Sequence, residues 1–270
     1  MPELPEVETT RRGIKPYIDQ QTVTKVIVRQ PKLRWPVPAE IQEMEGQIVE
    51  SVTRRGKYIL LETQKGTALI HLGMSGSLRV VEEGTEVEKH DHVDVVLDSG
   101  KAVRLRDPRR FGAFLWTTQN PHKHKLIRSL GPEPLSNEFN VDYLYHASRN
   151  RSMSIKQFIM NGHVVVGVGN IYACESLFKS NISPKWAAGK VSKARYQKLV
   201  DEIKTVLANA IEQGGTTLKD FVQVEGSPGY FKQELNVYGR ASEPCFVCNT
   251  SIKQITQGQR STFYCSKCQR

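Results

Sequence analysis

Four of the five cysteines occur as two Cys-x2-Cys pairs, and this spacing constrains the fold more than any other feature of the chain. The pairs are Cys245 with Cys248 and Cys265 with Cys268, and sixteen residues separate them. Each pair presents two thiolates from one tight turn, and two such turns can complete a tetrahedral zinc site. Because protein would fill all four positions, the zinc would be structural. Two disulfides are the alternative, which a reducing cytosol disfavours. Cys174 stands alone in a helical stretch and is predicted to be a small buried residue.

Positive charge is concentrated in two parts of the chain. The 270 residues include 38 Lys and Arg against 28 Asp and Glu, for a net charge of +10. The stretch Lys101–Arg128 has eight basic residues and one acid, and Cys245–Arg270 has four basic residues and no acid. This segregation is typical of a face that follows phosphates, although a solvated basic surface could also produce it. A polyanionic partner is therefore favoured.

The sequence argues against membrane insertion and export. No apolar run approaches the 18 residues that a membrane span needs. The first residues are rich in Pro and Glu, which is the reverse of the basic and then apolar layout of a signal peptide. We therefore expect a cytoplasmic protein with no membrane partner. The length suits two domains rather than one.

The hydrophobic pattern changes along the chain from strand-like to helical. A short helix is expected from Pro2 to about Ile18, followed by β-rich runs that indicate a sandwich or barrel. After Gly131-Pro132 the pattern becomes helical, with one helix beginning near Asn170 and an amphipathic helix over Tyr196–Ile211. Residues 216–239 are predicted to form a loop. The β-rich region extends from Thr22 to Trp116, and examples of its runs are Val23–Val28, Tyr58–Glu62, Ala68–Leu72, Ser77–Val81, His92–Leu97 and Phe111–Trp116.

The N-terminus offers a candidate nucleophile. Removal of Met1, expected before the small residue Pro2, would leave a secondary amine with Glu3 and Glu6 close by. An α-amino group has a pKa of about 7.7–8.0, so part of it is neutral at physiological pH and able to attack an electrophilic sugar carbon. The two carboxylates could move protons. An ordinary N-terminus with no catalytic role is the alternative.

Further motifs follow in order along the whole chain, and together they resemble the bacterial formamidopyrimidine-DNA glycosylase family, also called 8-oxoguanine DNA glycosylases. The segments are MPELPEVETTRRGI at the start, RRGKYILL (54–61), HLGMSGSL (71–78), KHDHVD (89–94), DPRRFG (107–112), GVGNIYA (167–173), EQGGTTLKDF (212–221), PGYFKQELNVYGR (228–240) and QRSTFYC (259–265). One departure is Asn161-Gly162-His163, where the family commonly has an acid and a base. We expect a local surface effect there.

The resemblance implies a catalytic set. Pro2 would be the nucleophile, Glu3 the acid that assists base loss and sugar-ring opening, and Glu6 a second carboxylate of the same pocket. Lys57 matches the proton donor for β-elimination. Arg260 matches an arginine that grips a phosphate beside the lesion and is assigned proton donation for δ-elimination. Because Arg stays protonated, the phosphate grip is the favoured role.

The resemblance also implies DNA contacts, because a base must leave the duplex before a nucleophile can reach it. Met74, Arg109 and Phe111 match the residues that fill the vacated stack, although Met74 and Phe111 could instead be core residues. The other implied contacts are His90, Arg151, Lys156 and Asn170, the last at a helix start that favours anions. The loop from about Thr216 to Tyr230 would cover the flipped purine.

The implied fold is α+β in three parts. Residues 1–130 would form an N-terminal β-sandwich with its helix, residues 131–235 a helix-two-turn-helix domain with the lesion loop, and residues 236–270 a zinc-binding β-hairpin. The implied function is a monomeric base-excision-repair glycosylase and AP lyase for oxidised purines in double-stranded DNA, located in the bacterial cytoplasm. Two alternatives remain, an endonuclease VIII-like enzyme for oxidised pyrimidines and a non-enzymatic zinc-ribbon DNA-binding protein.

Overall fold

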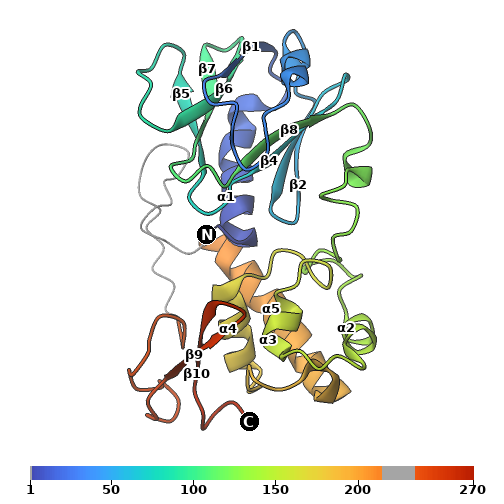
Figure 1. Ribbon diagram of the computed structural model, residues 1–270, viewed down its shortest axis with the longest axis vertical. Coiled ribbons are helices and arrows are strands. Elements are labelled where there is room, and N and C mark those ends of the chain that lie inside the picture. The colour runs from blue at the N-terminus through green and yellow to red at the C-terminus, as the bar shows by residue number, and fades with distance from the viewer. Residues whose placement is uncertain (1, 215–234) are drawn as a thin grey trace. The chain divides into compact units, whose positions relative to one another are not determined.

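The structure is a computed structural model that describes residues 2–214 and 235–270 (Figure 1). The described chain divides into two units, residues 2–129 with Gly214, and residues 130–213 with 235–270. The second unit therefore contains both the helical segment and the cysteine-rich segment. The predicted boundaries at residues 130 and 235 stay predictions, and the predicted lesion loop over residues 216–230 lies outside the described residues.

The first unit begins with helix α1, Leu4–Ile18. A proline is well suited to the first helical turn, where Pro5 lies, because its missing N–H has no helical acceptor there. The predicted inner face is confirmed, since Leu4, Val7 and Ile14 are all at most 1% exposed. Helix α1 contacts strands of both sheets of this unit and so lies against the common core.

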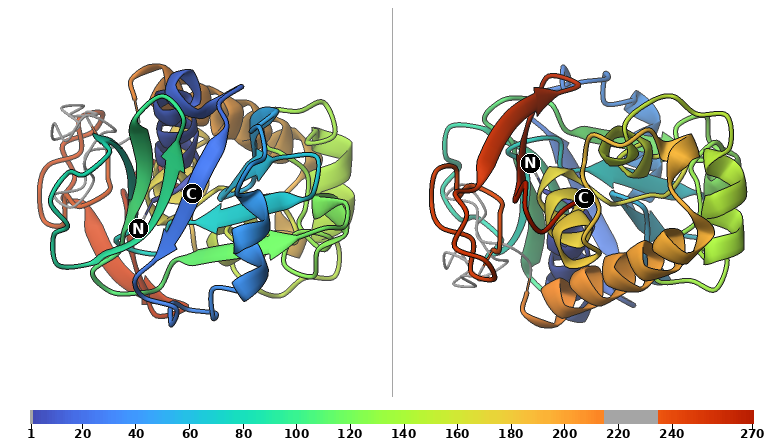
Figure 2. Two further views of the ribbon diagram at one scale, coloured as in Figure 1. Left: turned by 90° about the horizontal axis from the view of Figure 1, so that it is seen from above. Right: turned by 90° about the horizontal axis from the view of Figure 1, so that it is seen from below.

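Two antiparallel four-stranded sheets form the rest of the first unit (Figure 2). The first sheet has the order β1-β6-β7-β5 and the second has the order β2-β3-β4-β8. Their inward side chains share one apolar core with α1. The strands are β1 (Val23–Val28), β2 (Ser51–Arg55), β3 (Tyr58–Glu62), β4 (Thr67–His71), β5 (Ser77–Glu82), β6 (Asp91–Leu97), β7 (Lys101–Arg106) and β8 (Ala113–Thr117).

The predicted strands are confirmed with small shifts. Strands β2 and β7 were not among the runs named from the sequence, because they carry charged residues at positions that a simple alternation would make apolar. Arg104 of β7 is 3% exposed and is neutralised by Asp94 and Asp91 of the neighbouring strand. The predicted strand at Phe111–Trp116 begins instead at Ala113, because Asp107 holds the preceding residues in a loop.

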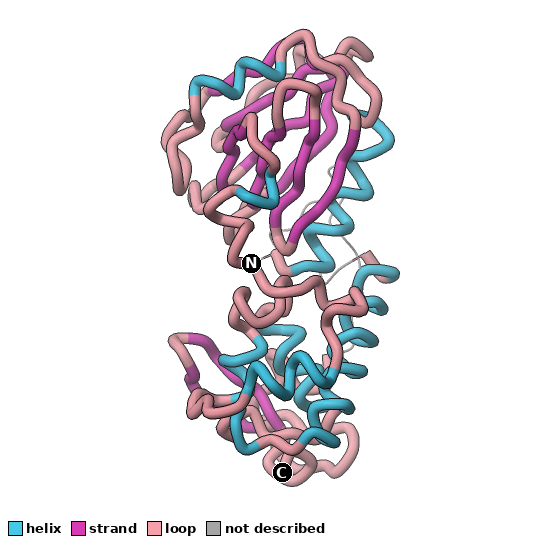
Figure 3. Tube along the Cα trace, turned by 90° about the vertical axis from the view of Figure 1, so that its right-hand side faces the viewer, coloured by secondary structure: helices cyan, strands magenta, loops and turns pink. Residues whose placement is uncertain are grey.

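The second unit contains four α-helices and one β-hairpin (Figure 3). Helix α4 begins at Asn170, as predicted, and α5 buries every apolar residue of the predicted Tyr196–Ile211 stripe. Residues 161–163, where the sequence departs from the family pattern, form a tight turn in which the Asn161 side chain accepts a hydrogen bond from the His163 N–H. The elements are α2 (Val141–Ser148), α3 (Ile155–Ile159), α4 (Asn170–Lys179), α5 (Lys193–Glu212), β9 (Lys253–Gln257) and β10 (Arg260–Tyr264).

The α+β class is therefore confirmed, with a sandwich and helix in one unit and helices with a hairpin in the other. Within residues 2–214 and 235–270, three short 3-10 helices, Ala39–Met44, Pro121–Lys123 and Ala188–Lys190, lie in the connections. Among the residues that the structure describes, none of the helices has the length and apolar character to cross a membrane.

Candidate functional site

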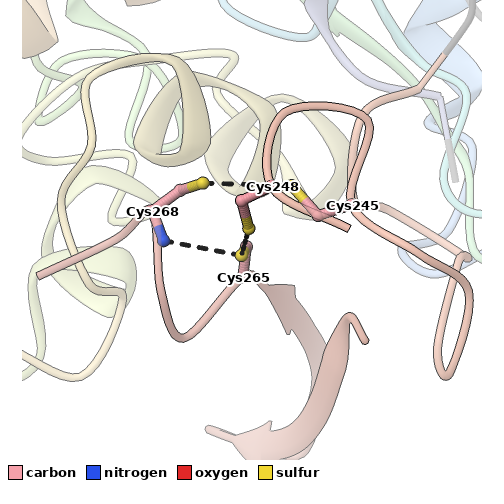
Figure 4. A group of neighbouring side chains, drawn as sticks. All are labelled: Cys245, Cys248, Cys265 and Cys268. Atoms are coloured by element: carbon pink, nitrogen blue, oxygen red, sulfur yellow. Dashed lines mark hydrogen bonds between the residues drawn. The ribbon is translucent and has the colours of Figure 1, made fainter. Parts of the chain in front are cut away.

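The four paired cysteines of the second unit converge on one point (Figure 4). Their sulfur atoms all lie within 4.8 Å of one another, with Cys245 Sγ 3.9 Å from Cys268 Sγ and Cys248 Sγ 3.4 Å from Cys265 Sγ. A tetrahedral zinc with Zn–S bonds of about 2.3 Å requires sulfurs roughly 3.8 Å apart, whereas a disulfide requires about 2.0 Å. The set fits one structural zinc, and the disulfide alternative is wrong.

Strand β10 begins with Arg260 and ends at Tyr264, directly before the zinc ligand Cys265. The hairpin turn uses Gly258 and Gln259, both with positive φ, as a two-residue hairpin turn requires. Arg260 pairs with Gln257 at the end of the ladder, and its side chain is exposed. The zinc-held loops therefore present one cation at the tip of a rigid hairpin.

Two other predicted residues of this unit bind the same strand. The buried ammonium of Lys156 donates to Thr262 Oγ1 at 2.6 Å and to the Ser261 carbonyl at 3.2 Å. Asn170 Nδ2 donates to the same carbonyl at 2.9 Å. Lys156, Asn170 and Arg260 are thus gathered along the start of β10. Arg151 is exposed in the connection between α2 and α3, and its carbonyl accepts from the Gly189 N–H.

In the first unit, the three predicted residues of the N-terminus lie together at the start of α1. Pro2 is buried, and Glu3 and Glu6 are 2% and 1% exposed. The Glu3 N–H donates to Glu6 Oε2 at 2.8 Å, so Glu6 fixes the peptide that follows Pro2. Once removal of Met1 turns the Pro2 nitrogen into an amine, two buried carboxyl groups beside it would form a set that can transfer protons within one small volume.

Lys57 lies in the two-residue turn that joins β2 to β3. Gly56, with φ +57°, allows this turn, and Arg54 Nη1 donates to the Gly56 carbonyl at 2.7 Å. Arg54 also contacts Glu8 of α1 at 3.1 Å. Because Glu8 lies beside Arg54 and Arg11 reaches the carbonyl of Val52, the N-terminal end of α1 points towards the turn that carries Lys57.

Glu8 forms ion pairs with Arg11 and Arg12 of its own helix and with Arg54 of β2. Burial alone would raise the pKa of its carboxyl group, but hydrogen bonds from Arg11 and Arg12 and the charges of Arg11 and Arg54 outweigh burial and lower the pKa to about 2. Glu8 therefore stays ionised and ties α1 to β2. Sequence reasoning missed this role, although the residue lies within the opening motif.

The predicted stack-filling residues lie on two loops that the sheet topology places side by side. One loop connects β4 to β5 and carries Met74, and the other connects β7 to β8 and carries Arg109 and Phe111. Both loops cross from one sheet to the other. Strands β4 and β8 pair where His71 faces Ala113, and strands β5 and β7 pair where Ser77 faces Arg106. The start of each loop therefore lies beside the end of the other.

Met74 and Phe111 are 39% and 42% exposed, so the core alternative is wrong for both. The Arg109 guanidinium lies 4.9 Å from the Phe111 ring centre. A flexible apolar chain, a cation and an aromatic ring are thus presented together on one surface, which is the chemistry that unstacking a duplex needs. His90, the remaining predicted contact, lies just before β6 with φ +81°, and its ring is edge-on to His92.

His71 is a further residue of this surface that sequence reasoning left without a role. It faces Tyr58 across β3 and β4, with ring centres 4.9 Å apart, and its Nδ1 accepts from the Gly73 N–H at 2.9 Å. Burial, followed by the positive charges of Lys57 and Arg34, lowers the pKa of His71 to about 4. In the sequence, His71 could have been noticed as the first residue of the segment HLGMSGSL (71–78).

These pairings place the candidate groups of the first unit at one end of its sandwich. Tyr58, directly after Lys57, faces His71, and His71 faces Ala113. The turn with Lys57 and the loops with Met74 and Phe111 therefore lie at the same end of the second sheet, and α1 points its N-terminal end there.

Comparisons with known proteins identify the family of the chain. Three family models match, the formamidopyrimidine-DNA glycosylase N-terminal domain over residues 1–114, the H2TH domain of the same glycosylase over 130–222, and a zinc finger found in FPG and IleRS over 242–270. A formamidopyrimidine-DNA glycosylase from Idiomarina loihiensis is 57% identical over 270 residues, with all of both chains covered. One from Pseudomonas aeruginosa is 57% identical over 271 residues, again with full coverage of both.

Solved structures are similar over the same length. The MutM (Fpg) protein from Thermus thermophilus has a TM-score of 0.89 at 33% identity, covering 99% of this chain and 98% of that one. A Lactococcus lactis FPG mutant in complex with DNA containing Fapy-dG has a TM-score of 0.92 at 29% identity, with full coverage of both chains. With three matching domain models and full-length relatives well above 30% identity, the chain belongs to the formamidopyrimidine-DNA glycosylase family.

Proposed function

We propose that the chain excises oxidised purines, 8-oxoguanine and formamidopyrimidines, from double-stranded DNA through an amine at Pro2. As a member of its family it is a DNA glycosylase of base-excision repair, and AP lyase activity is a general property of that family. Relatives from Lactococcus lactis have been solved with DNA containing Fapy-dG and with DNA containing an abasic site. What we propose for this chain is its substrate class and the role of each residue.

The observation that carries the proposal is the gathering of Pro2, Glu3 and Lys57 at one end of the sandwich. Plain DNA binding requires neither an N-terminal proline nor two buried carboxyl groups beside it. Glu6 holds the Glu3 amide at 2.8 Å, and Glu8 with Arg54 links α1 to the turn of Lys57. Such fixed positions are what catalysis by proximity needs.

The proposed reaction begins when the Pro2 nitrogen attacks C1′ of the deoxyribose. The bond from C1′ to the base breaks, and the base leaves with that electron pair and takes up the proton that the newly bonded Pro2 nitrogen loses. Glu3 assists by protonating the ring oxygen as the sugar opens, which leaves an iminium between Pro2 and C1′. The iminium acidifies the C2′ proton. Loss of this proton expels the 3′ phosphate, and a second elimination expels the 5′ phosphate.

Lys57 and Arg260 are assigned to the phosphates of these eliminations. Lys57 donates a proton in the β-elimination, and Arg260 grips a phosphate beside the lesion, since a guanidinium holds phosphate oxygens in a bidentate fork. Asn170, Arg151 and His90 are proposed as further DNA contacts, whereas Lys156, which is buried beneath β10, is proposed to act on the DNA by fixing that strand. The zinc takes no part in these steps and stabilises the hairpin that presents Arg260.

Met74, Arg109 and Phe111 are proposed to enter the space that the flipped nucleotide leaves. Flipping costs a few kcal/mol, and stacking and hydrogen bonding to the orphaned base offset that cost. All of the first-unit groups come from one chain, so a monomer suffices. A bacterial cytoplasmic location follows from the DNA substrate and is part of the proposal.

The decisive experiment is borohydride trapping on a duplex that contains 8-oxoguanine. We expect a covalent adduct whose peptide map places the DNA on Pro2. Pro2→Gly should lower the trapped yield strongly, whereas Pro5→Ala, which changes the next proline of the same segment, should not. Full yield from Pro2→Gly would mean that another group is the nucleophile.

A comparison of two substrates tests which damaged base the protein recognises. Duplexes with 8-oxoguanine and with thymine glycol are compared at equal enzyme concentration, and faster cleavage of the purine lesion is expected. A strong preference for thymine glycol would favour the oxidised-pyrimidine alternative. DNA binding without any trapped adduct on either lesion would favour a non-enzymatic binding protein.

A further inference from the structure

A buried carboxylate lies beneath the two loops that carry Met74, Arg109 and Phe111. Asp107 is 0% exposed. Its Oδ2 accepts from the Gly112 N–H at 2.7 Å, and its Oδ1 accepts from the Ser75 hydroxyl at 2.9 Å and from the Arg109 N–H at 3.3 Å. One side chain thus binds both loops, at the residue after Met74 and at the residues on either side of the Arg110–Phe111 segment.

The backbones of the two loops also approach too closely for ordinary side chains. A Cβ on Gly73 would lie 2.4 Å from the Phe111 carbonyl carbon, and Gly73 has φ +64°. A Cβ on Gly112 would lie 2.7 Å from the His71 carbonyl oxygen and 3.0 Å from Asp107 Oδ2. The contact between the loops is therefore built on glycines, and Asp107 supplies its central hydrogen bonds.

A second contact fixes the main chain of Asp107 itself. Its carbonyl oxygen lies 2.8 Å from Nε2 of His92, a buried residue of β6. Its N–H donates to the His90 carbonyl at 3.0 Å. Asp107 is thus anchored to the sheet, while Arg109, whose N–H it binds, and Phe111, which precedes its partner Gly112, are exposed.

We propose that Asp107 is the positioning residue of the duplex-inserting surface, holding the Met74 and Phe111 loops in the one geometry that can replace a flipped nucleotide. The proposal rests on the function given above for those loops. Exposed apolar side chains on independent loops would lose conformational entropy on insertion, whereas loops already fixed by a common carboxylate lose less. Asp107 acts through the loops and touches neither sugar nor base.

Asp107→Ala is expected to slow single-turnover excision of 8-oxoguanine from an intact duplex about 10- to 100-fold, the range expected when buried donors lose their acceptor. Trapping on a preformed abasic site in single-stranded DNA should stay within about threefold, because no stack has to be filled there. Asp107→Asn should restore most of the activity, because its amide can accept from Gly112 and donate to the Ser75 oxygen.

Two controls separate positioning from loss of folding. Asp94→Ala removes an equally buried carboxylate from β6, where it binds Arg29 and Arg104 away from the loops, and it should leave duplex excision unchanged below its melting temperature. In a double-mutant cycle with Phe111→Ala, the effect of Asp107→Ala should shrink to less than about threefold, because the loop no longer carries the inserting ring.

The proposal is overturned if folded Asp107→Ala excises the duplex lesion at the wild-type rate. It is equally overturned if the variant loses the same factor on duplex and single-stranded substrates, or if the two substitutions are additive in the cycle. Failure of the proposed function would appear differently, as an absence of trapping and excision by the wild-type protein itself.

Discussion

The ammonium of Lys156 lies 2.6 Å from the hydroxyl oxygen of Thr262, and both residues are 0% exposed. This contact joins α3 to the zinc-held strand β10 across more than a hundred residues of sequence. A buried ammonium is costly unless its hydrogen bonds are made, so the contact specifies one position of the strand. Arg260 begins that strand, two residues before Thr262.

Lys156→Met is expected to weaken binding to lesion-containing duplex about tenfold, because it removes a charge-assisted hydrogen bond that orders the strand. The zinc content should stay at one per chain. Since Lys156 is buried, the salt dependence of binding should keep its slope, whereas Arg260→Ala should reduce the slope by about one. Fluorescence anisotropy over a salt series measures both quantities.

Lys193→Met is the control, because Lys193 is an exposed residue of α5 that pairs with Asp142. It should change affinity little, as surface ion pairs contribute little. A slope reduced by about one in Lys156→Met would show instead that Lys156 itself neutralises a phosphate.

Zinc removal should unfold the hairpin and abolish DNA binding, because a structural zinc site contributes its binding free energy to folding. Cys248→Ser should bind less zinc and melt at a lower temperature. Cys174→Ala is the matched control, since Cys174 is 1% exposed and lies in the same apolar cluster as Cys245 and Cys265 without belonging to the four-sulfur set. Elemental analysis with thermal melting would decide the matter, and unchanged affinity after verified zinc loss would contradict the role of the metal.

Features that depend on local spacing were predictable from the sequence. Two Cys-x2-Cys turns carry their own geometry, and the start of α4 at Asn170 follows from the glycines before it. Sequence reasoning could not place Lys156 beneath β10, because that contact depends on how α3 packs against the hairpin. Asp107 was visible as part of a motif, yet its hydrogen bonds to both loops depend on the non-local pairing of β4 with β8 and of β5 with β7. Strand β7 was difficult to predict for a similar reason. The carboxylates that neutralise its buried Arg104 lie on another strand, so the sequence alone does not show that this arginine can be buried.

Glu8→Gln should destabilise the first unit by roughly 1–3 kcal/mol at pH 7, because Arg54 and Arg11 lose an ionised partner. The folded pKa of Glu8 is about 2 against an ordinary value of 4.5, so its contribution is complete above pH 4.5 and declines as the pH falls towards 2. The difference between wild type and variant should therefore shrink over that interval. Urea unfolding at several pH values measures it, with the exposed Glu50→Gln as control. A constant difference between pH 7 and pH 3 would contradict the ionic role.

His71 should make the first unit less stable in mild acid. Its folded pKa of about 4 lies below the ordinary 6.5, so the unfolded chain binds a proton first and stability falls as the pH decreases from 6.5 to 4. One proton contributes at most about 1.4 kcal/mol per pH unit.

His71→Asn keeps an acceptor for the Gly73 N–H but cannot titrate. Relative to wild type, the variant should gain stability as the pH falls through this window and level off below it. Urea unfolding of both proteins, with an NMR titration of the His71 ring, tests this directly. Parallel stability curves, or a ring that titrates near 6.5, would show that His71 is not held neutral by burial and by the charges of Lys57 and Arg34.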